Sequence, residues 1–188
     1  MFRRILVPVD GSPLADQILA PVRRLLLRED AELMLFRVLP PKPGPDRLKL
    51  WEEVCDRALQ HLEGLAAKWT RDGARVKTDT RPGGPATEVL KYADEWLPSL
   101  IAMSTHGRTG IDRWVRGSVA ERVLEHSPYP VLVANPRALE RTAPSGAPEF
   151  RRILVPIDGS ETSARILPRA IEIARLFEAD ITLFYCAL

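Results

Sequence analysis

Cysteine and histidine are scarce in this chain, and their positions limit the chemistry it can perform. The 188 residues contain two cysteines, Cys55 and Cys186, which lie far apart and form no CxxC pattern. A disulfide framework is therefore not expected. The three histidines, His61, His106 and His126, have no metal-site spacing with any cysteine or carboxylate. We predict plain thiols and no metal site.

Excess charge and long apolar runs are also missing. The formal net charge is +2, too small to indicate a nucleic-acid partner. No apolar run approaches the roughly 20 residues that a membrane span needs, and the one near the N-terminus is too short for a secretory signal. With 45% hydrophobic and 28% charged residues, the composition is that of an ordinary globular protein. We expect it in the cytoplasm, without a membrane partner.

Two familiar phosphate-binding motifs, GxxxxGK[ST] and GxGxxG, are absent, so a phosphate site would need another glycine spacing. Residues 100–121, LIAMSTHGRTGIDRWVRGSVAE, offer one. They pass from an apolar run through Gly107 and Gly110 to Gly117 and Ser118, where helical spacing begins. A strand, a glycine-bearing loop and a helix N-terminus together favour phosphate binding, because backbone N–H groups can approach the anion. The alternative is a surface loop with glycines at its turns.

Three polar side chains of this stretch have candidate roles. Arg108 supplies guanidinium donors for a phosphate. Ser118 either caps the new helix or donates its hydroxyl to a phosphate oxygen. His106 is a candidate general base, although hydrogen bonding within the loop is the simpler role, since no partner acid accompanies it. The stretch therefore indicates binding without dedicated catalysis.

Strands and helices are predicted to alternate through the first 134 residues. Apolar or alternating runs indicate strands at residues 5–9, 31–39, 74–80, 100–103 and 130–134. Helical spacing indicates helices at residues 13–26, 48–69, 86–96 and 117–126, the first capped by Ser12, begun by Pro13 and kinked at Pro21. This alternation predicts an α/β fold, a doubly wound five-stranded parallel sheet with helices on both faces. Ligands bind such sheets beyond the carboxyl ends of strands, where Asp10 and the loop after Met103 both lie.

The beginning of the chain then repeats. Residues 2–12 read FRRILVPVDGS and residues 150–160 read FRRILVPIDGS, so the two copies differ only at Val9 and Ile157. Between them, residues 135–149 are rich in proline, alanine and charge without periodicity, which indicates a linker. The predicted organisation is a complete domain at 1–134, a linker at 135–149 and a truncated second repeat at 150–188.

The second copy is expected to be a partial βαβ unit, with strands at 153–157 and 181–188 and a helix at 161–177. In a whole domain of this kind the first strand lies between the second and the fourth, so one side of 153–157 should lack a hydrogen-bonding partner. We expect completion by a second chain's half-unit or by packing on the first domain. Asp158 keeps the position of Asp10 without a phosphate loop opposite, so no nucleotide is expected there.

Two motifs at opposite ends of the first copy resemble those of the universal stress protein family: ILVPVDGS, and LIAMSTHGRTGIDRWVRGSVAERVLEHSPYPVLV. The ATP-binding branch of that family carries Gly, two residues, Gly, nine residues, Gly, then Ser or Thr. Gly107, nine residues, Gly117 and Ser118 match the larger part of this motif, while Ser104 stands in place of its first glycine. The resemblance covers residues 2–134 in full and 150–188 as a truncated copy.

The resemblance implies a Rossmann-like fold of the adenine nucleotide alpha hydrolase type, ATP as ligand with or without Mg2+, AMP at lower affinity, and a homodimer that pairs through residues 130–134. It also implies the site residues. Pro8, Val9 and Asp10 would lie against adenine and ribose, Val38 would face the adenine, and Met103 and Ser104 would lie beside the ribose. The phosphates would be surrounded by His106, Gly107, Arg108, Gly117, Ser118 and Val119.

Three functions are compatible with these features. The first is a cytoplasmic nucleotide-binding sensor without dedicated catalysis, which the resemblance implies. The second is an enzyme such as an ATP pyrophosphatase, whose phosphate loop usually follows the first strand; residues 10–13 are too short for that loop and lack its serines. The third is a dimerising structural module that has lost its ligand, since a fold alone does not determine function.

Overall fold

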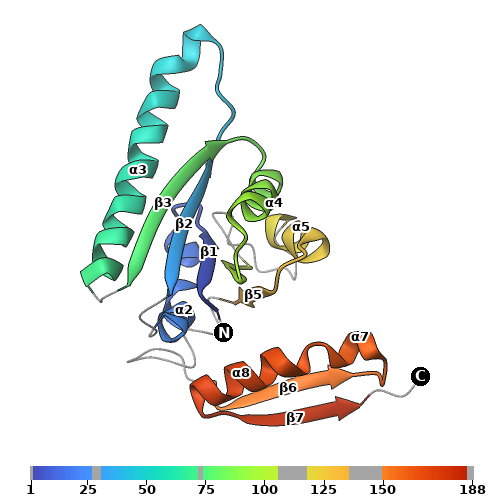
Figure 1. Cartoon of the computed structure of the whole chain (residues 1–188). Coiled ribbons are helices and arrows are strands. Elements are labelled where there is room, and N and C mark those ends of the chain that lie inside the picture. Colours follow the sequence, from blue (N-terminus) through green and yellow to red (C-terminus); the bar gives the residue numbers. More distant parts are fainter. Residues whose placement is uncertain (1, 27–30, 72–73, 106–117, 136–149, 186–188) are drawn as a thin grey trace. The chain divides into compact units, whose positions relative to one another are not determined.

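The computed structural model describes residues 2–26, 31–71, 74–105, 118–135 and 150–185 (Figure 1). The chain divides into two compact units, Phe2–Arg141 and Thr142–Leu188. The first contains a five-stranded sheet and the second a two-stranded sheet.

All strands of the first unit run parallel, as their apolar sequences predict. They are β1 (Arg4–Pro8), β2 (Glu32–Leu39), β3 (Arg75–Pro82), β4 (Leu100–Ser104) and β5 (Val131–Ala134), in the order β3-β2-β1-β4-β5. The sheet is thus of the predicted Rossmann-like, doubly wound kind. Its strand order reverses between β1 and β4, which is where such sheets bind ligands.

Helices cover both faces of this sheet (Figure 1). On one face lie α1 (Pro13–Asp16), α2 (Leu19–Leu25) and α3 (Leu48–Arg71), preceded by the 3-10 turn η1 (Pro45–Arg47); on the other lie α4 (Pro85–Trp96) and α5 (Ser118–His126). The α4–α5 core cluster consists of Leu6, Met34, Phe36, Ala86, Val89, Tyr92, Ala93, Ile101, Met103, Ala120 and Val123. Among the residues that the structure describes, no helix combines the length and apolar character required to cross a membrane.

The predicted kink at Pro21 is displaced. The helix is interrupted at Gln17 and Ile18, and Pro21 lies inside α2. A proline lacks the N–H that would bond to the carbonyl four residues earlier, and its ring clashes with that carbonyl. Here that carbonyl is Gln17 O, which instead accepts the Ala20 N–H at 3.1 Å. Proline therefore breaks the helix one turn before its own position.

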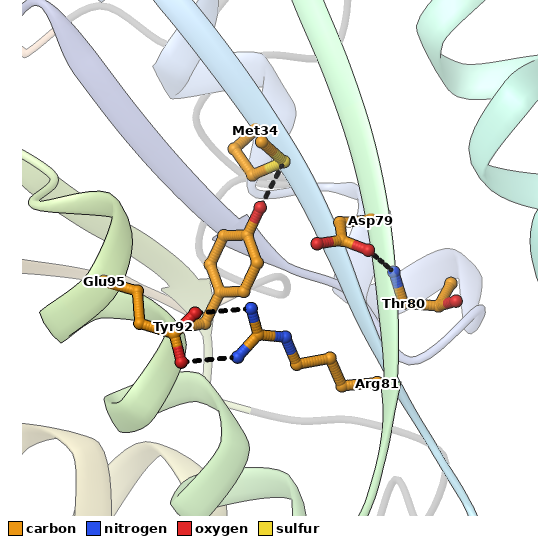
Figure 2. Close-up of polar contacts among 6 residues, drawn as sticks. All are labelled: Met34, Asp79, Thr80, Arg81, Tyr92 and Glu95. Atoms are coloured by element: carbon orange, nitrogen blue, oxygen red, sulfur yellow. Dashed lines mark hydrogen bonds and ion pairs between the residues drawn. The ribbon is translucent and has the colours of Figure 1, made fainter.

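Polar and aromatic contacts hold α4 against β2 and β3 (Figure 2). The Arg81 guanidinium donates to both Glu95 carboxylate oxygens, at 2.8 and 2.6 Å, and lies 4.7 Å from the ring centre of Tyr92. Tyr92 stacks on Phe36 with ring centres 4.4 Å apart, and its hydroxyl donates to Met34 Sδ at 3.4 Å. One helical turn of α4, from Tyr92 to Glu95, is thus fixed to the strands beneath it.

The Tyr92 hydroxyl is perturbed by these surroundings. Burial, together with the nearby Asp79 carboxylate, raises the pKa of Tyr92 to about 12. Asp79 is itself held in place, because its Oδ1 accepts the Thr80 N–H at 2.7 Å. Tyr92 therefore stays neutral at physiological pH.

The second unit consists of β6 (Arg152–Ile157), α7 (Glu161–Ala164), α8 (Leu167–Phe177) and β7 (Asp180–Tyr185), with β6 and β7 parallel. The single helix predicted at 161–177 is wrong, because it is interrupted at Arg165 and Ile166. Pro168 in the first turn of α8 cannot bond to the carbonyl of Ala164, four residues earlier. Among the described residues β6 has β7 as its one neighbour, which agrees with the predicted open side.

Candidate functional site

Three of the residues predicted to bind nucleotide lie at the carboxyl ends of three neighbouring strands. Pro8 is the last residue of β1, Val38 is the penultimate residue of β2, and Ser104 is the last residue of β4. Since these strands are parallel, their carboxyl ends share one edge of the sheet. Val9 is tied to the same edge, because its N–H donates to the Phe36 carbonyl at 2.9 Å.

The Asp10–Gly11–Ser12 turn follows β1 and has a defined geometry. The Asp10 Oδ1 accepts the Ser12 N–H at 2.9 Å, and the Ser12 Oγ accepts the Ala15 N–H at 3.1 Å. Gly11 has φ +80°, a left-handed conformation that glycine adopts without steric cost. Ser12 is thus the N-cap, as predicted. Asp10 braces the turn before the helix and does not cap the helix directly.

The second unit reproduces this turn closely. Asp158 Oδ1 accepts the Ser160 N–H at 2.9 Å, Ser160 Oγ accepts the Ser163 N–H at 3.1 Å, and Gly159 has φ +84°. Hydrogen bonds from Ser163 and Ser160 hold the pKa of the Asp158 carboxyl well below its usual range. The turn is therefore a local property of the sequence DGS, and its presence alone does not identify a nucleotide site.

Arg37 distinguishes the first turn from the second, and the sequence analysis missed it. Its side chain is buried, and a Cβ added to Gly11 would lie 2.5–2.8 Å from three guanidinium atoms. The corresponding residue of the second unit is Tyr185, which is exposed and lies against Gly159. The sequence did contain a signal for this residue: Arg37 lies inside the apolar run of β2, and a cation in a buried strand requires partners.

An apolar layer lies beneath the predicted crevice. Met103 is buried in the α4–α5 core cluster. Val38 and Val119 are partly buried and pack against that cluster. Beside them, the Thr105 N–H donates to the Ala134 carbonyl at 3.0 Å, which ties the segment after Ser104 to β5. Three predicted site residues thus belong to one packed layer.

The phosphate-loop residues His106, Gly107, Arg108 and Gly117 lie outside the described residues. Ser118 begins α5, as predicted for a helix that follows the loop. The arrangement of these residues around a phosphate stays a prediction.

A cleft of about 370 Å³ lies beside the predicted crevice, between the N-terminal turn of α4 and α5. It is lined by Gly84, Pro85, Ala86, Thr87, Val119, Glu121, Arg122 and Glu125. Val119 is the one lining residue that was also predicted for the nucleotide. The sequence analysis assigned no site residue to the segment before α4, so it did not anticipate this cleft. Within the described part of the chain, no group of three or more His, Cys, Asp or Glu side chains gathers to hold a metal.

Comparison with known proteins gives consistent results. The universal stress protein family model matches residues 1–135 and 149–187. Universal stress protein MJ0531 of Methanocaldococcus jannaschii is 30% identical over 142 residues, covering 71% of this chain and 82% of that protein. The solved structure of MJ0577, from the same organism, superposes with a TM-score of 0.68 at 28% identity, covering 72% of this chain and 96% of that one.

A solved universal stress protein from Archaeoglobus fulgidus DSM 4304 extends the likeness in fold. It covers 97% of this chain and 65% of its own length, with a TM-score of 0.76 at 23% identity. The family match spans most of both units, and the relative at 30% identity carries the same family name. This chain belongs to the universal stress protein family.

Proposed function

We propose that the first unit binds an adenine nucleotide, ATP with AMP as a weaker ligand, beyond the carboxyl ends of β1 and β4, and acts as a sensor without dedicated catalysis. The observation that carries this proposal is the reversal of strand order between β1 and β4. Parallel sheets bind ligands at this point. The predicted residues from β1, β2 and β4 end at that same edge.

The chemistry of these residues suits the parts of a nucleotide. Asp10, on a braced turn, offers carboxylate oxygens to ribose hydroxyls or to the base amine. Val38 offers partly buried apolar surface to the base. The N-terminus of α5, at Ser118, offers backbone N–H groups to phosphate. Gly107, nine residues, Gly117 and Ser118 carry the larger part of the ATP-binding motif.

Ser104 is the departure from that motif, and it is compatible with binding. Serine is small, and its hydroxyl can donate to a ribose or phosphate oxygen. Mg2+ would be held by the phosphates more than by the protein, which is common for this ion. His106 has no partner acid in the sequence motif, so we assign no catalytic residue.

Equilibrium dialysis of the full chain against labelled ATP tests the proposal, and the two copies supply a matched control. Asp10 and Asp158 form the same turn, so Asp10→Asn and Asp158→Asn should perturb folding similarly. We expect Asp10→Asn to weaken ATP binding and Asp158→Asn to leave it unchanged. Equal effects of the two variants, or no binding by the parent chain, would favour the structural module that has lost its ligand.

A second pair of variants tests the glycine loop. Gly117→Val places a branched side chain where the phosphate should approach the backbone, and we expect it to abolish ATP binding. Gly64→Val is its control, because a Cβ at Gly64, within α3, meets nothing within 4 Å. If the Gly117 variant binds ATP as the parent does, the proposed phosphate site is wrong.

The proposal includes assembly and location. β5 is an outer strand of the first sheet, and its four residues are uncharged. An unpaired apolar edge favours association, so we assign β5 to a homodimer interface. We place the protein in the cytoplasm, which imaging of a tagged chain would test.

A further inference from the structure

Arg37 is a buried cation near the carboxyl end of β2. It is 9% exposed, and the strand residues before it, from Leu33 to Phe36, are apolar and buried. Arginine stays charged throughout the physiological pH range, and a charge taken out of water costs free energy even where it gains partners. An apolar side chain at this position would pack without that cost. Stability alone therefore does not account for an arginine here.

The guanidinium of Arg37 lies flat against Gly11. A Cβ built on Gly11 would lie 2.5 Å from Nη1 and 2.8 Å from both Cζ and Nη2, so the three atoms are almost equally distant. Strands β1 and β2 hold this contact in register, because Pro8 pairs with Phe36 and the Val9 N–H donates to the Phe36 carbonyl. The chain thus leaves β1 and turns against the guanidinium.

The shape of this turn and its placement against the sheet have different sources. Its shape comes from local hydrogen bonds, Ser12 N–H to Asp10 and Ala15 N–H to Ser12. The second unit repeats these bonds with Tyr185 at the position of Arg37. They join residues 10–15 to one another and do not reach β2, so they leave the turn free to tilt as a body. The contact with Arg37 does reach β2, and it limits that tilt.

Two consecutive residues near the end of β2 face opposite sides of the sheet. Val38 packs against the α4–α5 core cluster on one face. Since side chains alternate along a strand, Arg37 points to the other face, where it meets Gly11. The end of one strand thus carries both the apolar surface predicted to face adenine and the group on which the Asp10 turn rests. This arrangement sets the separation between Val38 and Asp10.

We propose that Arg37 is a positioning residue of the nucleotide site: its guanidinium supports Gly11 and so holds the Asp10 carboxylate at the distance from Val38 that one adenosine moiety spans. This role rests on the proposed nucleotide site and explains how that site is preorganised. Preorganised groups bind more tightly, because binding then requires less ordering. Adenosine, AMP and ATP share the part of the ligand that these residues contact, so loss of Arg37 should weaken all three by the same factor.

Isothermal titration calorimetry of the full chain with ATP, AMP and adenosine tests this role. Arg37→Met removes the guanidinium and keeps an unbranched side chain, and we expect it to raise all three dissociation constants about tenfold. Arg75→Met is the control, because Arg75 is an exposed arginine at the amino end of β3, on the opposite edge of the sheet. In an Asp10→Asn background, Arg37→Met should change the dissociation constants by less than about twofold, since the carboxylate that it positions is already gone.

Three results would overturn the proposal. The first is an Arg37→Met variant that binds all three ligands as the parent does. The second is a larger loss for ATP than for adenosine, which would identify a charge acting on the phosphates. The third is an undiminished loss in the Asp10→Asn background, which would identify a general loss of structure. Unfolding in urea checks the fold, and Arg37→Gln repeats the test if Arg37→Met misfolds.

Nuclear magnetic resonance relaxation of the ligand-free chain separates this role from the proposed function. The backbone order parameter of Gly11 should fall from about 0.85 in the parent to below about 0.6 in Arg37→Met, while that of Gly159 in the second unit should stay as in the parent. If the parent binds none of the three ligands, the proposed function is wrong, and the mobility of Gly11 still decides whether Arg37 holds the turn. A Gly11 as rigid in Arg37→Met as in the parent would overturn the inference.

Discussion

Replacing Gly11 by alanine should destabilise the first unit and weaken ATP binding. Gly11 has φ +80°, and the new Cβ would lie 2.5 Å from Nη1 of the buried Arg37. The left-handed conformation costs a non-glycine residue about 1–2 kcal/mol, and overpacking against a buried group costs about 1–3 kcal/mol. We therefore expect Gly11→Ala to lower the free energy of unfolding by about 2–5 kcal/mol.

The second copy provides the control for this prediction. Gly159 has nearly the same φ, +84°, but its added Cβ would lie 3.2 Å from the ring of the exposed Tyr185, which is free to move aside. Gly159→Ala should thus carry only the conformational cost, about 1–2 kcal/mol, and that cost falls on the second unit. ATP binding should be unchanged in this variant.

Tryptophan fluorescence separates the two units, because all four tryptophans, at positions 51, 69, 96 and 114, lie in the first. With a urea m-value of about 2 kcal/mol/M, Gly11→Ala should lower the tryptophan-reported midpoint by about 1–2.5 M. Gly159→Ala should leave that midpoint unchanged. If the two variants shift it equally, or Gly11→Ala shifts it by less than about 0.5 M, crowding by Arg37 is not the cause.

A double substitution isolates the crowding. In an Arg37→Met background the guanidinium is gone, so Gly11→Ala should cost only its conformational part, about 1–2 kcal/mol. The difference between this value and the cost in the parent background is the coupling energy between the two positions. A coupling near zero would contradict the contact that the structure shows.

Three further predictions concern ionisation, turnover and assembly. Stability of the first unit should fall between about pH 10 and 12, because Tyr92 ionises near 10 when unfolded and at about 12 when folded. That contribution to the free energy of unfolding, about 2–3 kcal/mol, is complete below pH 10 and is lost as pH rises through 12. Urea titrations at several pH values should show that Tyr92→Phe lacks this loss. An equal pH dependence of the unfolding free energy in the parent chain and in Tyr92→Phe would contradict the prediction. ATP turnover should stay below the ~1 s⁻¹ typical of slow enzymes, and a magnesium-dependent rate of about 10 s⁻¹ that His106→Ala abolishes would identify an enzyme. Light scattering should show a dimer that Leu132→Asp, on β5, converts to a monomer, and a monomeric parent would exclude this interface.

The sequence determined much of the fold, because the relevant signals are local. Continuous apolar runs mark parallel strands buried on both faces, and their alternation with helical spacing led to the doubly wound sheet that the structure shows. The DGS turn forms with the same hydrogen bonds in both units, since Asp, Gly and Ser specify it within three residues. The crevice beyond the ends of β1 and β4 followed from the parallel sheet, whereas the individual residues, Val38 on β2 among them, came from the family resemblance.

Contacts between segments that lie far apart in the chain could not be predicted from the sequence. Arg37 on β2 meets Gly11 after β1, and Arg81 and Glu95 join β3 to α4. Each contact depends on strand order and on the side-chain directions that packing selects. The helix break before Pro21 was misplaced and the one before Pro168 was missed, because proline acts on a carbonyl four residues earlier.

The repeated strand shows most clearly what the local sequence determines and what the tertiary structure decides. FRRILVP occurs twice and forms a strand both times, so local sequence sets its conformation. Its environment differs, because β4 lies beside β1 whereas the edge of β6 away from β7 has no neighbour among the described residues. Burial is a property of the neighbours that a segment acquires, and those neighbours come from elsewhere in the chain or from another molecule. Only the tertiary structure decides whether the same leucine lies in a core, as Leu6 does, or on a surface, as Leu154 does.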